Sequence, residues 1–123
     1  MADVDEVLRR NLLEVFGERD GERRRAAMAT VLSADVQFHD PEGAVRGRDE
    51  VEAKVAALLA DAPGFVFRLT GAVRVSGDLG VLTWSFGPEE GTPVVTGTDI
   101  ALVDDGLIVR LHTLLDEPGD GPA

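Results

Sequence analysis

FHDPEG (residues 38–43) and TGTDIALV (residues 96–103) are the two stretches of sequence that decide the fold. Each places an aspartate, Asp40 or Asp99, inside or at the end of an apolar run of β-strand character. Burying a carboxylate costs several kcal/mol, roughly, unless the group is hydrogen-bonded, paired or neutralised by a shifted pKa. The two aspartates therefore predict a site built on a sheet.

The hydrophobic pattern changes once along the chain, from a helical to a strand period. Asp40 ends the first strand, because Pro41 disfavours the helical conformation in the residue before it. Turn residues separate the later strands, so these form an antiparallel meander with the helices on one face. We predict an α+β fold, with helices over residues 4–16, 22–32 and 47–62 and strands over residues 36–40, 65–75, 80–86, 94–103 and 107–115.

Composition limits the classes of function. The chain has 123 residues, 44% of them hydrophobic, which suits a single domain over residues 1–116 with a disordered tail over residues 117–123. A net charge of -11 excludes nucleic acid and anionic membranes as partners. The one basic run, Arg23 to Arg25, is interpreted as a solvated helix face. An acidic N-terminus and no bilayer-length apolar run lead us to expect a cytoplasmic protein.

Four motifs together resemble the nuclear transport factor 2-like (NTF2-like) superfamily, and within it the SnoaL-like polyketide cyclases and ketosteroid isomerases. These motifs are FHDPEG, GRDEV (residues 47–51), GTD (residues 97–99) and DGLI (residues 105–108). The resemblance implies a cystatin-like cone, in which a curved sheet wraps around helices and encloses a ligand cavity. It covers nearly the whole chain.

The resemblance also implies roles for the two aspartates. Asp40 falls where a ketosteroid isomerase keeps its general base. Asp99 falls where that enzyme keeps a protonated acid that hydrogen-bonds the oxyanion. Ketosteroid isomerase is the standard example of a carboxylic acid whose surroundings keep it neutral. The family's third element is a tyrosine on the first helix. This chain contains no tyrosine, and Phe16 or Leu12 falls in that neighbourhood.

Strand alternation gives a less specific interpretation of Asp40 and Asp99. Val36, Phe38 and Asp40 share one face, so the first strand delivers a carboxylate to the rim of a cavity. The alternative is a turn aspartate that binds backbone amides just beyond Pro41.

Asp99 shares its face with Gly97, Ala101 and Val103. If that face is concave, burial raises the pKa of Asp99 and favours the neutral acid. The alternative is a salt bridge to an arginine, for which the candidates are Arg68, Arg74 and Arg110.

Large side chains are expected to line an apolar, substrate-binding cavity. Trp84 and Phe86 share a face with Leu82, and we add Phe16 and Phe38 to the predicted binding set. The alternative is plain core packing. The two histidines, His39 and His112, are too few for a metal site and are placed on the surface; neither a metal nor a cofactor is expected.

Three functions fit this pattern. The first is a proton-transfer enzyme (isomerase, cyclase or dehydratase) acting on a hydrophobic carbonyl or polyketide-like compound, with Asp40 and Asp99 as catalytic residues. The second is a non-catalytic module that binds a small hydrophobic molecule or serves assembly, which the missing tyrosine favours. The third is an epoxide hydrolase-like activity, to which only Asp99 and Arg110 could contribute.

We also expect a homodimer. Ile100, Leu102, Leu114 and His112 fall on the sheet face that the helices cannot cover, and an exposed apolar patch of this kind usually marks an interface.

Overall fold

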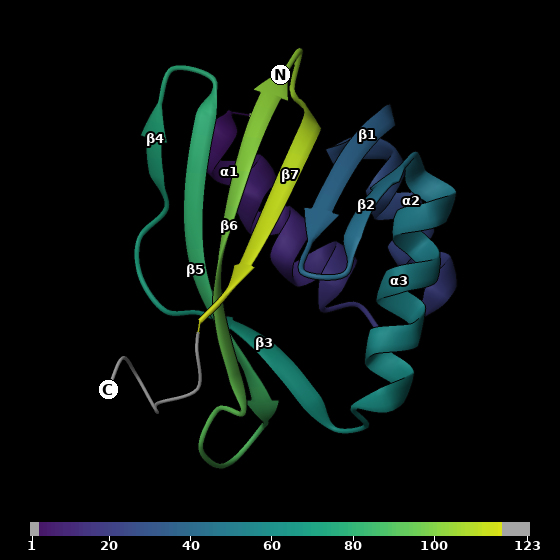
Figure 1. Cartoon of the computed structure of the whole chain (residues 1–123), viewed down its shortest axis with the longest axis vertical. Coiled ribbons are helices and arrows are strands. Elements are labelled where there is room, and N and C mark those ends of the chain that lie inside the picture. Colours follow the sequence, from purple (N-terminus) through teal and green to yellow (C-terminus); the bar gives the residue numbers. More distant parts are fainter. Residues whose placement is uncertain (1–2, 117–123) are drawn as a thin grey trace.

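The computed structural model describes residues 3–116, so the expected tail over residues 117–123 lies outside the described residues. The chain order mixes helices and strands in the first half and contains only strands afterwards (Figure 1). The elements are α1 (Val4–Arg10), η1 (Asn11–Phe16), α2 (Gly21–Val31), β1 (Leu32–Asp40), β2 (Gly43–Arg46), α3 (Arg48–Asp61), β3 (Phe65–Leu69), β4 (Arg74–Ser76), β5 (Leu79–Pro88), β6 (Val95–Asp104) and β7 (Leu107–Leu115).

The strands form one sheet in the order β2-β1-β7-β6-β5-β3, with β4 paired to β5 off this path. Every pairing is antiparallel except that of β1 with β7, which is parallel. α1 and η1 form one continuous helix whose second half has π-type hydrogen bonding. The predicted α+β class, with three helices on a mainly antiparallel sheet, is confirmed.

Two strand predictions need correction. Residues 43–46 were expected to be a connection, but they form β2, which turns back at Pro41 and pairs with the end of β1. Four residues without a clear alternation give too little pattern to identify a strand. The run expected over residues 65–75 is broken around Gly71 into β3 and β4, and both of these strands pair with β5.

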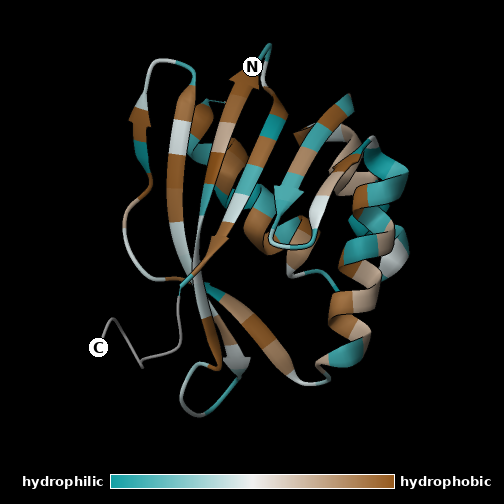
Figure 2. Cartoon of the chain, in the orientation of Figure 1, coloured by the Kyte–Doolittle hydropathy of each residue, from teal (hydrophilic) through white to brown (hydrophobic). Residues whose placement is uncertain are grey.

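The core lies between the helices and the inner face of the sheet. Figure 2 shows strands on which hydrophobic residues alternate with polar ones, as expected for a sheet covered on one side. Fully buried side chains come from every helix and from the long strands; they include Val7, Leu12, Met28, Val36, Val55, Leu82, Ile108 and Leu111.

Contacts of two arginines, the buried Arg24 and the exposed Arg19, fix the position of α3. Arg24 is only 4% exposed and binds Glu52 of α3 through Nε (2.6 Å) and Nη2 (2.9 Å), so its interpretation as solvated surface was wrong. This pairing lowers the pKa of Glu52 and raises that of Arg24. Arg19 donates to the backbone carbonyls of Leu59, Ala62 and Phe65 at 2.6–2.9 Å, at the corner between α3 and β3. α3 is thereby held at a set distance from the sheet.

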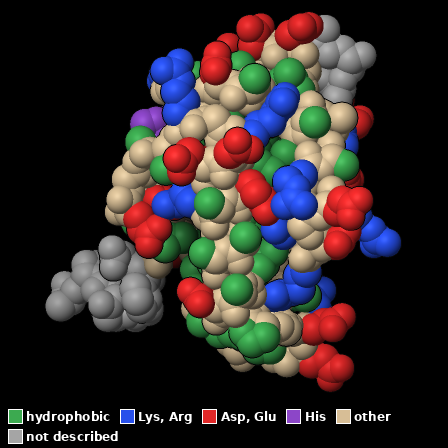
Figure 3. Space-filling view, turned by 90° about the vertical axis from the view of Figure 1, so that its right-hand side faces the viewer, with side chains coloured by type: hydrophobic (Ala, Val, Ile, Leu, Met, Phe, Trp, Pro, Cys, Tyr) green, Lys and Arg blue, Asp and Glu red, His purple; other side chains and the backbone are tan. Residues whose placement is uncertain are grey.

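No helix among the described residues is long and apolar enough to cross a membrane. On the side of the molecule formed by α3, side chains of both charges are spread over the surface and apolar ones gather near the lower end (Figure 3).

The sheet face opposite the helices keeps the features that led us to expect a dimer. Leu114 is 56% exposed, and Ile100, Leu102 and His112 are half-buried beside it on β6 and β7. The homodimer stays a prediction. We expect light scattering at micromolar concentration to give the dimer mass for the wild type and the monomer mass for Leu114→Glu, because the introduced charge would have to be desolvated in the interface.

Leu13→Glu is the matched control, since Leu13 is 46% exposed but lies on the helical segment η1, away from this face. A wild type that runs as a monomer, or a Leu13 variant that dissociates as readily as the Leu114 variant, would contradict the predicted interface.

Candidate functional site

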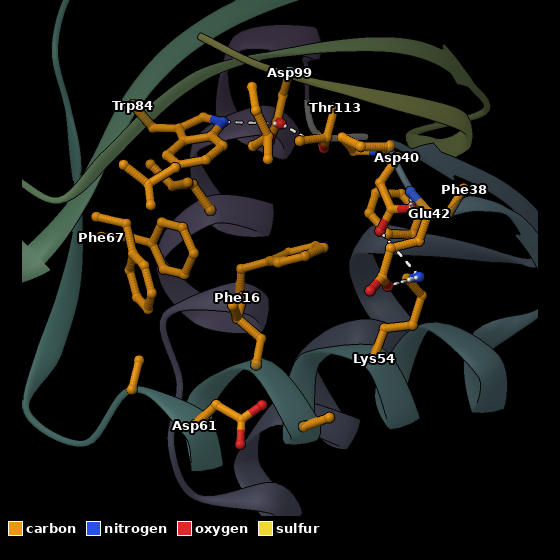
Figure 4. A pocket seen from close by; sticks show the side chains of 18 of the residues that line it. Phe16, Phe38, Asp40, Glu42, Lys54, Asp61, Phe67, Trp84, Asp99 and Thr113 are labelled. Atoms are coloured by element: carbon orange, nitrogen blue, oxygen red, sulfur yellow. Dashed lines mark hydrogen bonds and ion pairs between the residues drawn. The ribbon is translucent and has the colours of Figure 1, made fainter. Parts of the chain in front are cut away.

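A pocket of about 720 Å³ lies between α3, η1 and the inner face of the sheet (Figure 4). That volume is within the range of ordinary small-molecule sites, roughly 300–1,000 Å³. All six residues predicted from the sequence line it, namely Phe16, Phe38, Asp40, Trp84, Phe86 and Asp99. Their roles in catalysis or binding stay predictions, but the structure brings them to one place.

Asp99 is the most buried charged group of the pocket, with 7% of its surface exposed. It lies on β6 between β5 and β7, and both neighbouring strands donate to its Oδ1: Trp84 through Nε1 at 3.0 Å and Thr113 through Oγ1 at 2.8 Å. No residue between 3 and 116 donates a hydrogen bond to Oδ2. One carboxylate oxygen is therefore held in place and the other is available to a ligand.

Gly97 makes the Trp84 contact possible. Gly97 lies directly opposite Trp84 in the β5–β6 register, two residues before Asp99. A Cβ at this position would lie 2.6 Å from the carbonyl oxygen of Leu114, and it would collide with the indole ring itself. The absence of a side chain lets the indole lie across β6 and reach Asp99.

Burial determines the protonation of Asp99. Desolvation raises the pKa of this carboxyl group to about 6, and the hydrogen bonds from Thr113 and Trp84 offset part of that effect. None of the described residues forms an ion pair with Asp99, so the alternative of a salt bridge to Arg68, Arg74 or Arg110 was wrong. At neutral pH the group is mainly ionised, and it takes up a proton readily below pH 6.

Asp40 lies at the rim of the pocket, as the strand period predicted, but both of its oxygens are engaged. Oδ1 accepts a hydrogen bond from the backbone N–H of Glu42 at 2.9 Å, which is the turn contact considered as the alternative. Oδ2 is 3.0 Å from the ammonium group of Lys54, which also binds Glu42 Oε1 at 2.9 Å. These carboxylates raise the pKa of Lys54, so it stays charged.

The pocket residues that sequence reasoning missed include Lys54, Phe67 and Thr113. Lys54 belongs to a second stripe of α3, spaced at three and four residues, that faces the pocket while Val51, Val55 and Leu59 face the core. That spacing could have identified Lys54. Thr113 could have been found from its register opposite Asp99, but only once the pairing of β6 with β7 was known.

Aromatic rings form the walls. Phe16 packs against Phe38 with ring centroids 5.7 Å apart, and Phe67 stacks on Phe86 at 4.2 Å and meets Trp84 edge-on at 5.4 Å. Trp84 and Phe86 are 5% and 4% exposed, so they serve as core and as pocket lining at once. Phe16 and Leu12 occupy the helical wall, and neither carries a hydroxyl group.

The two histidines lie outside this site. His39 and His112 are paired in the β1–β7 register, and their rings stack at 4.4 Å. Burial, together with the charges of His39 and Arg110, lowers the pKa of His112. Among residues 3–116, no group of three or more histidine, cysteine or acidic side chains could hold a metal ion.

Comparison with known proteins identifies the class. The family model described as the SnoaL-like domain matches residues 10–111, so this chain belongs to the SnoaL-like family. Its fold is that of the NTF2-like superfamily, and matching structures are described as NTF2-like or as cystatin-like in fold. No curated protein matches the chain.

Three of the solved structures that match the chain illustrate its similarity to known proteins. A candidate isomerase of the SnoaL-like family from Agrobacterium tumefaciens is 25% identical over 91% of this chain and 96% of its own, with a TM-score of 0.84. A candidate SnoaL-like polyketide cyclase from Jannaschia is 20% identical over 94% of this chain and 90% of its own, with a TM-score of 0.76. A candidate ketosteroid isomerase from Kribbella flavida is 18% identical over 98% of this chain and 82% of its own, with a TM-score of 0.69.

The close approach at Gly97 can be tested by adding one methyl group. We expect Gly97→Ala to lower the free energy of unfolding by about 1–3 kcal/mol, the usual cost of overpacking, and to displace the indole from Asp99. Urea unfolding measures the first effect. The second should shift the emission of Trp84, which is the only tryptophan.

Gly71→Ala is the control, because a Cβ there meets only Thr83 Oγ1 at an ordinary 3.4 Å. Unchanged stability and unchanged emission in Gly97→Ala would show that the indole does not depend on this glycine.

Proposed function

We propose that this protein is a proton-transfer enzyme, an isomerase, cyclase or dehydratase, acting on a hydrophobic carbonyl or polyketide-like compound. The observation that carries the proposal is Asp99, a buried carboxylate with one free oxygen in an aromatic pocket and a pKa of about 6. A general base is most effective when its pKa lies near the working pH.

The chemistry assigned to Asp99 is a reversible proton transfer. Its carboxylate removes a proton from the carbon next to the substrate carbonyl, and the electron pair of the broken C–H bond forms the enolate. The protonated acid then returns the proton to the same carbon or to another carbon of the conjugated system. Trp84 and Thr113 fix Oδ1, so Oδ2 takes and returns the proton.

Asp40 receives a different role from the one that the family resemblance implies. Its two oxygens bind Glu42 and Lys54, so a proton transfer would require it to leave these partners. We assign Asp40 to the positioning of Lys54. An ammonium group has three N–H donors, and the third is available to the enolate oxygen, in place of the tyrosine hydroxyl that the resemblance to ketosteroid isomerases would imply.

A second candidate is a non-catalytic binding module. It is favoured by the purely apolar helical wall, where Phe16 and Leu12 offer no donor to an oxyanion. The epoxide hydrolase-like alternative loses its support, because Arg110 is exposed and no arginine is among the described residues that line the pocket. The cytoplasmic location expected from the sequence stays a prediction.

Exchange of α-protons with solvent tests the proposal without knowledge of the natural substrate. Incubation of a hydrophobic ketone such as 2-tetralone in heavy water, followed by NMR, should show exchange that Asp99→Asn reduces by about 10²–10⁴-fold. Asp40→Asn should reduce the exchange rate less. Asp78→Asn, at an exposed turn outside the pocket, should leave the exchange rate unchanged.

The pH profile distinguishes base from acid. If Asp99 acts as the carboxylate, kcat/KM for exchange rises with pH through about 6 and is level above it. If Asp99 acts as a neutral donor, the rate instead falls as the pH rises through the same value. Full activity of Asp99→Asn with loss in Asp40→Asn would restore the family assignment, and ligand binding without any exchange would favour the binding module.

A further inference from the structure

The pocket carries a strong excess of negative charge. Five carboxyl groups and one amine line it, and these belong to Asp40, Glu42, Glu50, Asp61, Asp99 and Lys54. The amine is already bound by two of the carboxylates, at 3.0 Å and 2.9 Å. The remaining acidic groups have no cation to compensate them within the pocket, which disfavours an anionic ligand.

Among these acidic groups, Asp99 is the one that the absence of a compensating cation affects most. It is 93% buried by area, it has no ion-pair partner among residues 3–116, and its Oδ2 has no hydrogen-bond donor there. Figure 4 shows the carboxylate at the inner end of the pocket, between Trp84 and Thr113. A buried charge in this state gains more from a cation than an exposed one does, because water competes less.

The walls around Asp99 also suit a cation. Phe67 and Trp84 meet edge-on at 5.4 Å, and the ring centroids of Phe16 and Phe38, which line the same pocket, are 5.7 Å apart. Aromatic faces attract cations as well as apolar groups. A carboxylate in a pocket lined by aromatic rings is therefore complementary to a compound that is apolar in its body and positively charged at one end.

We propose that this pocket binds a hydrophobic amine in its protonated form, with the ammonium group paired to Asp99 Oδ2 and the apolar body packed among the aromatic rings. The inference goes beyond the proposed function, because it concerns the charge of the ligand and requires no turnover. A ketone substrate and such an amine would compete for the same carboxylate.

Three adamantane derivatives of one shape and different charge test this inference by calorimetry. They are 1-adamantanamine, which is a cation at neutral pH, 1-adamantanol, which is neutral, and adamantane-1-carboxylate, which is an anion. We expect the amine to bind on the order of tenfold or more tightly than the alcohol, and the carboxylate to bind weakest.

Variants assign the preference to a residue. Asp99→Asn keeps the shape of the side chain and removes its charge, so it should bind amine and alcohol alike. Glu50→Gln removes the same charge from an exposed position on the rim and should keep most of the preference.

Titration of the wild type gives a readout that does not depend on how any variant folds. Asp99 becomes protonated as the pH falls through about 6, so the advantage of the amine over the alcohol should disappear there. Its strand neighbours Trp84 and Thr113 do not titrate in this range. The other charged groups that face the pocket are Asp40 and Glu42, paired with Lys54, and Glu50 and Asp61 at the rim.

Equal affinity for amine and alcohol, a preference that survives in Asp99→Asn or below pH 6, or no binding of any of the three would overturn the inference. Absence of ketone exchange with the amine preference intact would reject the proposed chemistry and leave the ligand class standing. Ketone exchange without an amine preference would reject the ligand class and leave the proposed chemistry standing.

Discussion

The carboxylate of Asp99 is the group on which the arrangement of the site depends. A charge that is 93% buried is tolerated only if the surrounding structure stabilises it, and here the stabilising donors come from the two strands that flank β6. Trp84 must lie on β5 and Thr113 on β7, in a fixed register with Asp99. A shift of either strand by one residue would turn its donor to the other face of the sheet. The hydrogen bonds of the site therefore require one particular register of the sheet.

The opposite wall of the pocket depends on a different interaction. The pocket-facing stripe of α3 meets β1 through the ion pair of Lys54 with Asp40, and the helix is held from behind by Arg24 and at its C-terminal end by Arg19. A buried pair such as Arg24 with Glu52 contributes little net stability compared with apolar packing, but it specifies geometry. The arginine contacts of α3 keep the cavity open, because a helix attached by apolar contacts alone would gain packing energy by closing onto the sheet.

The sequence predicted the elements that have a long and regular pattern. α3, β5, β6 and β7 were identified to within about two residues, and strand alternation placed Asp40, Trp84 and Phe86 on the pocket side. For Asp99 alternation left the face open, and the family resemblance favoured the pocket side. Long amphipathic segments report which face is buried, so such predictions follow from period alone.

What the sequence did not predict depends on partners that are distant along the chain. Lys54 meets Asp40 across the space between α3 and β1, and Arg24 is buried only because Glu52 faces it. A charged residue in a helix is usually solvated, so the pattern of Arg23 to Arg25 indicates surface until the partner is known. The ion pair of Asp40 with Lys54 could not be predicted for the same reason, since the family pattern fixes the position of Asp40 but not its neighbours.

The protonation of Asp99 connects the site to the stability of the fold. Its pKa is higher in the folded protein, about 6, than the ordinary value of 3.8, so the folded state binds the proton more tightly than the unfolded chain does. The free energy of unfolding therefore decreases as the pH rises from about 4 to about 6, and the loss persists above that range. At about 1.4 kcal/mol per pKa unit the ionised group costs the fold a few kcal/mol.

A leucine at position 99 would avoid the cost of burying a charge, although it would leave the donors of Trp84 and Thr113 without this acceptor. The retained carboxylate thus opposes the stability of the fold, and the energy it costs is regained only when a proton or a cationic group reaches Oδ2. Proton transfer and amine binding both use this one property, an anion that the surrounding residues hold in place without neutralising it.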